Sequence, residues 1–428
     1  MRRLAPLVFL VVFLVGLFAD PEPSHAELNL GGEVATTGTF YPREGVEGRD
    51  LQWSLQAELD LSLRFHRNWR ASLAPRVHYD PLDPGRWRWV PKEAKVDFRR
   101  GPWRGTAGRD HIVWGAADTF NPTDLLSVRD LGLDFVDGES PGEWLARFAY
   151  GRPGWGLEFV FLPVLEGAKF PSARSPWSIS NAFDRLSGFD FNVPLDDDPR
   201  LPPETEEVSF AVRARRSFSG TDVFLVGYSG IDRNPVLTVR FDGLFPNQLR
   251  STYLPLHLIG LETQTVLGGF VLKGAATFRD QSVDDAGFSS TVFGALGLSR
   301  HSLQGVVGLE YLFEEGPFGG SLDLGAELLL EDGSSENAIT SYRPFDRDLA
   351  LYINYLAQDL SDTTIELAWL QDLRRAESVG VFRLTRRIRG PLKLEFGGDL
   401  ILGPDSGSSP YTLFRANDRV LFGLNYGF

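Results

Sequence analysis

Residues 51–66 have the sequence LQWSLQAELDLSLRFH, in which apolar and polar side chains alternate. Every odd position from 53 to 65 is apolar, and the even positions between them are Ser, Gln, Glu, Asp or Arg. Such alternation puts one face of a β-strand in apolar surroundings and the other in water. A strand in a globular sheet has about 5–6 residues, whereas a tilted strand that crosses a bilayer needs about 9–11. These residues therefore predict a strand of membrane-spanning length.

The same period of two recurs along most of the chain. Trp and Tyr lie near the ends of these segments, as expected for aromatic girdles at membrane interfaces. A secreted β-sandwich would explain any one segment, but not so many long strands with charged alternate faces. The pattern predicts an all-β fold, a transmembrane antiparallel up-and-down β-barrel. The clearest further segments are 69–79, 94–98, 144–150, 208–214, 270–278, 309–313, 365–369 and 392–400.

Residues 1–26 have the features of a signal peptide. Arg2 and Arg3 precede an apolar run over residues 4–18, and Ser24-His25-Ala26 puts small side chains at the −3 and −1 positions of a cleavage site. The apolar run is shorter than the ~20 residues that span a bilayer, which argues against a membrane anchor. We therefore expect export of a mature chain, residues 27–428, to the outer membrane of a Gram-negative bacterium.

The last residues of the chain alternate in the same way and end in an aromatic side chain. Here the chain resembles outer-membrane β-barrels as a class, whose final strand is read by the barrel-assembly machinery. The resemblance implies an assembly signal, with that machinery as a partner and with membrane lipid and lipopolysaccharide as surroundings. The implied signal residues are Val420, Phe422, Leu424, Tyr426 and Phe428.

Composition excludes several classes of function. The chain has no cysteine, which rules out disulfides, Cys-ligated zinc and covalently attached haem, so we expect neither a metal nor a cofactor. A net charge of −14 argues against nucleic acid, whose phosphates recruit Lys and Arg. No Gly-x-Ser-x-Gly elbow accompanies the histidines, and His66 and His301 fall at predicted periplasmic turns. We therefore expect no enzymatic activity.

Strand parity predicts about 18 strands, with 16 and 20 as alternatives. Single-chain bacterial barrels have even strand numbers, short periplasmic turns and longer outer loops. The apolar segments 236–242 and 318–331 stay unassigned, because counting both as strands puts the tight turn at 267–269 outside and the longer connection 280–288 in the periplasm. Long extracellular loops are expected near 114–142, 164–204, 230–254 and 314–346. The predicted strands are 28–40, 51–66, 69–79, 92–100, 103–113, 143–151, 155–163, 205–216, 221–229, 255–266, 270–279, 289–299, 303–313, 347–357, 362–371, 376–386, 391–402 and 418–428.

A barrel of this size has an interior that must be explained. About 8 strands are filled by side chains, whereas 16–18 leave an aqueous channel. The plain interpretation of the charges on the predicted inner face is a wall that keeps the channel wet. The alternative is a transverse field across a constriction that attracts or orients polar solutes. The predicted pore-lining residues are Glu58, Asp60, Arg64, Arg76, Asp97, Arg99, Arg104, Arg213, Arg215 and Lys273.

The loop at 114–142 follows a distinctive motif. Gly108-Arg109 leads to Trp114-Gly115 and then to Phe120-Asn121-Pro122-Thr123-Asp124. This resembles a poorly characterised group of porin-like proteobacterial outer-membrane barrels with a "GR…WG…FNP.D" segment after an early strand. The resemblance implies a barrel channel.

The loop is also too apolar to stay in water. We expect it to fold inward and narrow the pore, with Asp118, Phe120, Asn121 and Asp124 at the constriction. The alternative is a lid packed over the barrel mouth.

These inferences predict a porin-like channel for passive passage of small polar or charged solutes. Two alternatives remain open. The barrel could be a scaffold or sheath around a periplasmic partner such as a lipoprotein or a multihaem cytochrome, or an exporter of polysaccharide.

Overall fold

The computed structural model describes residues 26–43, 50–136, 138, 140–187, 192–202, 205–242, 245–281, 301–316, 319–332, 347–404 and 414–428. The predicted signal peptide, except Ala26, lies outside the described residues.

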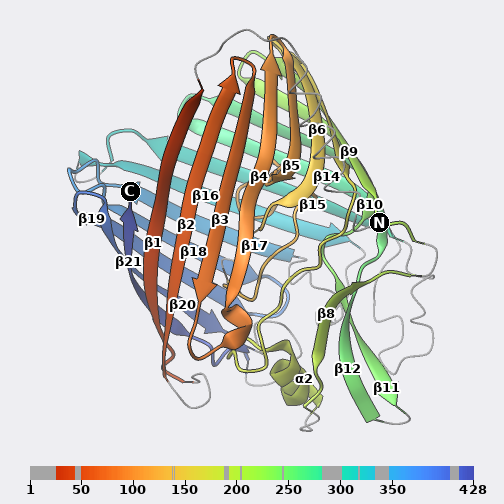
Figure 1. The fold of residues 1–428 in the computed structure, drawn as a ribbon, viewed down its shortest axis with the longest axis vertical. Helices are drawn as coiled ribbons and strands as arrows, with labels where there is room; N and C mark the ends of the chain where they lie inside the picture. The colour runs from red at the N-terminus through yellow and green to blue at the C-terminus, as the bar shows by residue number, and fades with distance from the viewer. Residues whose placement is uncertain are drawn as a thin grey trace.

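Eighteen strands form one closed antiparallel barrel (Figure 1). The strand β1 (Glu27–Phe40) pairs with β2 (Leu51–His66) on one side and with β21 (Arg419–Gly427) on the other, which closes the sheet without an edge. The strands that complete it are β3 (Trp69–Tyr79), β4 (Arg88–Arg100), β5 (Trp103–Asp110), β6 (Glu143–Arg152), β7 (Trp155–Leu162), β9 (Ser209–Phe218), β10 (Thr221–Ile231), β13 (Pro255–Leu267), β14 (Phe270–Gln281), β15 (His301–Phe313), β16 (Ser321–Asp332), β17 (Arg347–Leu356), β18 (Thr364–Asp372), β19 (Ser378–Arg389) and β20 (Leu392–Leu402).

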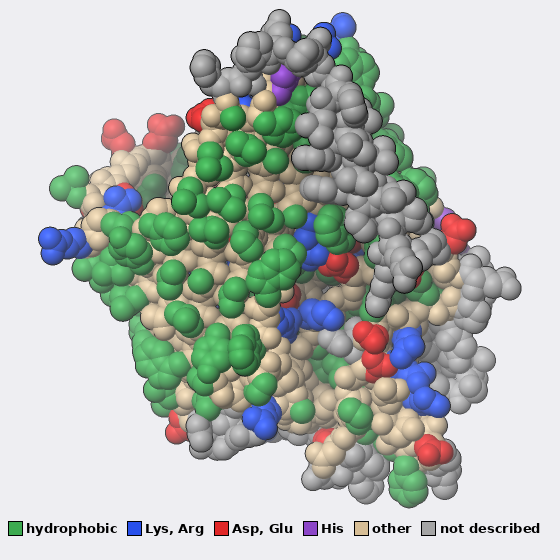
Figure 2. Space-filling model, viewed as in Figure 1, with side chains coloured by type: hydrophobic (Ala, Val, Ile, Leu, Met, Phe, Trp, Pro, Cys, Tyr) green, Lys and Arg blue, Asp and Glu red, His purple; other side chains and the backbone are tan. Residues whose placement is uncertain are grey.

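The alternation of side chains sorts each strand into an outer and an inner face. On β15, Leu303 and Val307 are 56% and 67% exposed, whereas Gln304 and Val306 between them are buried. Hydrophobic side chains spread across the strands in Figure 2, with few charges among them. An outward apolar band of this kind is what a membrane-spanning barrel presents to lipid.

The two ends of the barrel differ in their connections. At one end, which we call the short-turn end, tight turns join β2 to β3, β4 to β5, β6 to β7, β9 to β10, β13 to β14 and β19 to β20. Gly101 and Gly268 adopt φ values of 58° and 63° there, which suits glycine. The opposite end, the long-loop end, carries the connections 111–142, 163–208 and 232–254.

Aromatic side chains gather near both ends of the outer face. At the short-turn end the rings of Trp103 and Tyr150 lie 4.3 Å apart between centroids, and those of Phe270 and Tyr311 lie 4.5 Å apart. At the long-loop end, Trp87 meets Tyr79 at 5.5 Å. Two such girdles match the two interfaces of a bilayer.

The last strand closes the barrel. Phe428 exchanges two backbone hydrogen bonds with Gly32 of β1, at 2.9 and 3.0 Å. The ring of Phe422 covers the face of Gly38, where a Cβ would collide with it. The predicted residues from Val420 to Phe428 lie on the outer face, and their role as an assembly signal stays a prediction.

A cap covers the long-loop end. It contains the helix α2 (Ile179–Ser187) and a three-stranded sheet of β8 (Leu195–Arg200), β11 (Val236–Asp242) and β12 (Phe245–Thr252), which lie together beyond the barrel strands in Figure 1. None of the helices in the described part of the chain is long and apolar enough to cross a membrane. One hydrophobic core joins the cap to the opposite barrel wall, and it includes Leu131, Phe170, Trp177, Phe183, Leu237, Leu249, Val379, Ile401 and Phe414.

The predicted number of 18 strands is confirmed, but the strands that make it up differ from those predicted. β14 pairs directly with β15, with Asp280 opposite His301. The predicted strand 289–299 lies outside the described residues. The unassigned segment 318–331 includes all of β16 except its last residue, Asp332, and this strand interrupts the predicted loop 314–346. His301 consequently lies at the long-loop end, and its predicted place at a periplasmic turn is wrong. The other unassigned segment, 236–242, is β11 of the cap.

Candidate functional site in the barrel interior

The connection between β5 and β6, residues 111–142, enters the barrel, and we call it the inner segment. Glu327 of β16 is 1% exposed and holds it. The backbone N–H groups of Asp118, Thr119 and Phe120 donate to its carboxylate at 2.7, 2.9 and 3.0 Å. Three consecutive N–H donors on one buried carboxylate are charge-assisted hydrogen bonds, which are stronger than neutral ones. This strand therefore fixes the inner segment to the inner wall.

The motif residues explain how the segment turns. The Asn121 side chain donates to the Trp114 carbonyl at 2.5 Å, and its amide oxygen lies 3.1 Å from the Thr123 hydroxyl oxygen. A Cβ at Gly115, whose φ is 144°, would collide with the Asn121 amide. The Trp-Gly and Asn-Pro-Thr-Asp parts of the motif thus depend on each other, because only glycine leaves room for the asparagine that closes the turn.

Apolar contacts carry the segment across the interior. Phe120 and Ala117 pack against inward residues of β14 to β17, namely Ala275, Val306, Leu329 and Ala350. Trp114, Leu125 and Leu126 pack against inward residues of β6 to β13, namely Leu145, Val160, Leu162, Ala211, Val226, Tyr228, Leu256 and Leu258. The later residues Leu131 and Phe135 join the core of the cap. The early part of this connection therefore packs against the inner wall and its later part packs in the cap, whereas narrowing of a pore stays a prediction.

Asp118 lies on the inner segment beside β14 and β17. Its carboxylate forms an ion pair with Lys273 of β14 and accepts a hydrogen bond from the Tyr352 hydroxyl at 2.9 Å. Lys273 also contacts Glu310 of β15 at 2.5 Å. The Asp118 side chain is 54% exposed and that of Lys273 only 7%. The acid is therefore accessible to solvent, and the lysine is enclosed by its partners.

A second carboxylate holds the other side of the turn. The Thr123 hydroxyl donates to Glu262 of β13, which also pairs with Arg213 of β9 at 2.8 Å. The guanidinium of Arg213 lies 3.9 Å from the centroid of the Phe224 ring, a cation–π contact. Arg213 is thus part of the support for the inner segment.

Asp124 is buried without full hydrogen bonding. Its Oδ1 atom accepts no hydrogen bond from any described residue. Burial raises the pKa of this carboxyl from 3.8 to about 6, and Arg129 opposes the rise. Because charged carboxylates are costly to bury, the ionised form strains this part of the segment near neutral pH.

The predicted pore-lining residues divide into two groups. Some are committed to partners: Glu58 pairs with Arg76 at 2.6 Å, and Asp97 accepts from Thr106 at 2.7 Å. Arg64 lies 3.5 Å from Glu27, and both side chains are about half exposed. The remaining four, Asp60, Arg99, Arg104 and Arg215, are exposed on the inward-facing positions of their strands.

Several residues of this interior were missed from the sequence. Glu327 fell in the segment left unassigned, and Glu262, Glu310 and Tyr352 carried no signal beyond their alternation. Glu262, Glu327 and Tyr352 contact residues of the inner segment more than 130 positions away, as Thr123 and Glu262 are separated by 139. Glu310 acts through Lys273. Within the described residues, no cluster of three or more His, Cys, Asp or Glu could hold a metal ion.

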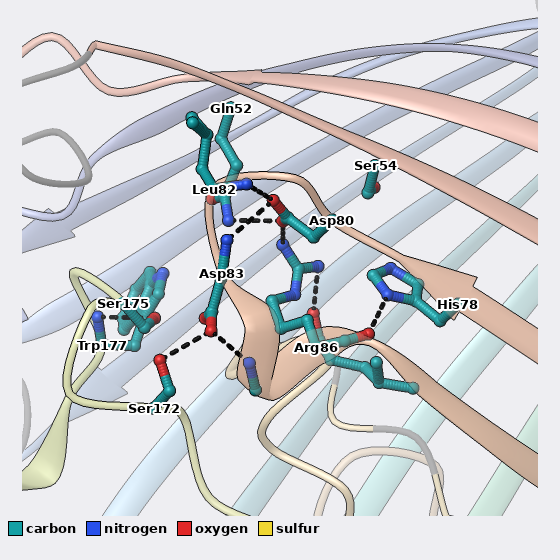
Figure 3. A network of polar contacts seen from close by, with 12 residues as sticks. Gln52, Ser54, His78, Asp80, Leu82, Asp83, Arg86, Ser172, Ser175 and Trp177 are labelled. Atoms are coloured by element: carbon teal, nitrogen blue, oxygen red, sulfur yellow. Dashed lines mark hydrogen bonds and ion pairs between the residues drawn. The ribbon is translucent and has the colours of Figure 1, made fainter.

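A polar network fixes the cap to the barrel rim (Figure 3). Arg86, the last residue of the 3-10 turn η1 (Pro84–Arg86), pairs with Asp80 at 2.8 Å and donates to the Leu133 carbonyl at 2.7 Å. Asp83 accepts from the Ser172 hydroxyl at 2.6 Å. The rim between β3 and β4 is therefore bonded both to the inner segment and to the connection that carries α2.

No protein-family model matches the chain, and no curated protein matches it. Solved structures are similar to it in fold. A triple mutant of the Rhodopseudomonas blastica porin is 12% identical with a TM-score of 0.41, over 94% of this chain and 100% of that one. Salmonella typhi OmpF in complex with daunomycin is 12% identical with a TM-score of 0.45, over 94% and 97%. Because these TM-scores are below 0.5, the barrel assignment rests on the strand pairing.

Proposed function

We propose that the chain is an outer-membrane, porin-like channel that small polar or charged solutes cross passively, and that the inner segment narrows it. The observation that carries the proposal is the half-exposed Asp118 carboxylate, held inside the barrel by a segment bonded to Glu327 and Glu262. A charge kept in water at this place belongs to a wet passage and not to a filled barrel. The mutual fit of Gly115 and Asn121 supports membership of the group with the "GR…WG…FNP.D" motif.

The surroundings follow from the outer face. The apolar band between two aromatic girdles suits a bilayer, and the predicted signal peptide suits export. By the usual orientation of such barrels, the cap faces outside and the short-turn end faces the periplasm.

The interior charges support passage of charged solutes. Arg99 and Arg104 lie on β4 and β5, whereas Asp118, Glu310 and Asp323 lie around β15 and β16. Following the pairings, β16 is nine strands from β4 in the closed sheet of 18, which is the opposite side of the barrel. Opposed charges produce a transverse field that orients dipolar solutes and slows apolar ones.

Conductance of the purified barrel in planar bilayers tests the proposal. We expect stepwise increases in current, and neutral sugars of increasing size should cease to pass at a cutoff set by the inner segment. Folded protein that inserts but leaves the bilayer silent would contradict it. Co-purification of such silent protein with a periplasmic lipoprotein or a haem protein would replace the channel with a sheath.

A further inference from the structure

Four arginines on the inner wall near the short-turn end have exposed guanidinium groups. They are Arg70 of β3, Arg99 of β4, Arg104 of β5 and Arg215 of β9. Among the residues that the structure describes, none of these side chains has an ion-pair or hydrogen-bond partner. This differs from the interior arginines nearer the cap, such as Arg76 and Arg213, which are buried in ion pairs.

Three of the four are close together because of the strand register. Arg99 and Arg104 are directly opposite each other in the β4–β5 pair. Arg70 is opposite Asp97, two residues from Arg99 on the same face, and Arg64 is opposite Arg70. Directly opposed side chains have Cβ atoms about 4.5–5.5 Å apart, and like charges there are destabilising. We call Arg64, Arg70, Arg99 and Arg104 the arginine patch.

Few acids compensate the patch. Asp97 lies within it and accepts from Thr106, and Glu27 lies 3.5 Å from Arg64. Asp60 is on the same face of β2, four residues nearer the cap than Arg64. The patch therefore keeps an excess of positive charge that its own neighbours leave in water.

The wall beside the patch leaves room for a ligand. Arg104 is opposite Ala149 of β6, and the next inward positions are Gly151 and Gly156. A Cβ at Gly151 would meet no atom within 4 Å. Arg215, opposite Gly156, stands on the far side of this flat strip.

We propose that the arginine patch, with Arg215 across the glycine strip, is a binding site for a compact multivalent oxyanion of the phosphate type. Guanidinium groups bind phosphate oxygens through two parallel N–H bonds each, and a ligand with several charged oxygens relieves the repulsion between Arg99 and Arg104. A monovalent ion engages only one such fork. Because the side chains face inward, the ligand is a solute of the lumen and not a lipid headgroup.

This site rests on the proposed function, since it names the solutes that the channel would favour. The passage would collect such anions at its periplasmic end, after they had passed Asp118. Anions that enter the barrel would then bind at the arginine patch, although the chain as a whole is acidic.

Calorimetric titration of the detergent-solubilised full barrel with inorganic pyrophosphate at low salt tests the site. The chain offers matched controls, because Arg100 and Arg216 neighbour Arg99 and Arg215 but are opposite Trp103 and Trp155 on the outer face. We expect Arg99→Gln to weaken binding about threefold, as for an exposed ion pair. A protein that carries both Arg70→Gln and Arg104→Gln should bind pyrophosphate more than tenfold more weakly. Arg100→Gln and Arg216→Gln should leave the affinity unchanged.

Equal affinities in Arg99→Gln and Arg100→Gln would overturn the site, as would wild-type barrel that binds no pyrophosphate. Bilayer recordings separate this failure from failure of the channel. Wild-type protein that conducts but neither binds pyrophosphate nor is blocked by it retains the channel and loses the site. Protein that binds pyrophosphate but does not conduct retains the site and loses the channel.

Discussion

Replacing Glu327 with Gln should loosen the inner segment without disturbing the barrel. The carboxylate accepts backbone hydrogen bonds from Asp118, Thr119 and Phe120 at 2.7, 2.9 and 3.0 Å. Gln fills the same space, but it has one acceptor oxygen and directs an NH₂ group at donors. At least one of the three N–H groups then has no acceptor.

The size of the effect follows from the bonds lost. A hydrogen bond to a charged group contributes about 1.5–3 kcal/mol, and an orphaned buried donor costs a similar amount. Losing one to two bonds weakens the attachment by about 3 kcal/mol, which multiplies the detached fraction more than a hundredfold. The Phe120 ring still packs against the wall, so the segment should detach transiently and not permanently.

Single-channel recording measures this detachment. We expect Glu327→Gln to show a larger mean conductance with frequent flickering between two levels. Glu331→Gln is the matched control, because Glu331 lies on the same strand and face and accepts a hydrogen bond from Gln304 of β15. If Glu327→Gln keeps the wild-type conductance and noise while its thermal stability falls, Glu327 supports only the wall and the argument for a constriction is refuted.

Four further outcomes are expected. In this cysteine-free chain, Asp118→Cys should react with a charged, water-soluble thiosulfonate, and the modification should reduce conductance; an unreactive thiol would place Asp118 away from the lumen. Because burial raises the pKa of Asp124 to about 6, its contribution to stability is complete below pH 3.8 and lost as the pH rises through 6; Asp124→Asn should raise the thermal midpoint at pH 7.5 and reduce its shift between pH 5 and 7.5. Leu261→Arg, on the outer face, should lower the free energy of unfolding in lipid vesicles by about 2–4 kcal/mol, and Gln264→Arg, facing inward, by much less. Phe428→Ala should slow assembly in a reaction with the assembly machinery, followed by the gel mobility of folded barrel, and unchanged kinetics would remove this residue from the signal.

The strands that face water on the inside were predicted almost to the residue. Residues 51–66 form β2 with the predicted bounds, because one face meets lipid and the other meets water along the whole strand. β16 was missed for a different reason. Its outer positions Leu322, Leu324, Leu328 and Leu330 alternate with inner ones, of which Leu329 packs against Phe120. The segment stayed unassigned because counting it together with 236–242 put a tight turn outside, so the rule of short periplasmic turns outweighed the alternation.

The predicted total of 18 is still correct, because closure of the barrel requires an even number of strands but does not decide which segments form them. Omitting β16 and including 289–299 preserved an even number, but it reversed the direction assigned to β15 and moved His301 to the wrong end. An even number of strands therefore does not reveal that one strand has been missed and another segment counted in its place.

The site was predictable in its chemistry but not in its pairing. Alternation placed charges on the inner face, and the apolar loop indicated that something lies inside the barrel. Which charges remain available depends on contacts such as Asp118 with Lys273, separated by 155 residues, which no local pattern encodes.

The distribution of partners along the barrel axis bears on selectivity more than the net charge does. Toward the cap, the interior charges form ion pairs, as Arg279 does with Asp232 at 2.8 Å and Arg419 does with Asp399. Toward the short-turn end, Arg99 and Arg104 remain exposed. A charge already paired and buried exerts little field on a passing ion, whereas an unpaired one in the lumen acts at close range. The net charge of −14 therefore does not by itself set the selectivity of the proposed channel, because exposed arginines line part of the inner wall at the short-turn end.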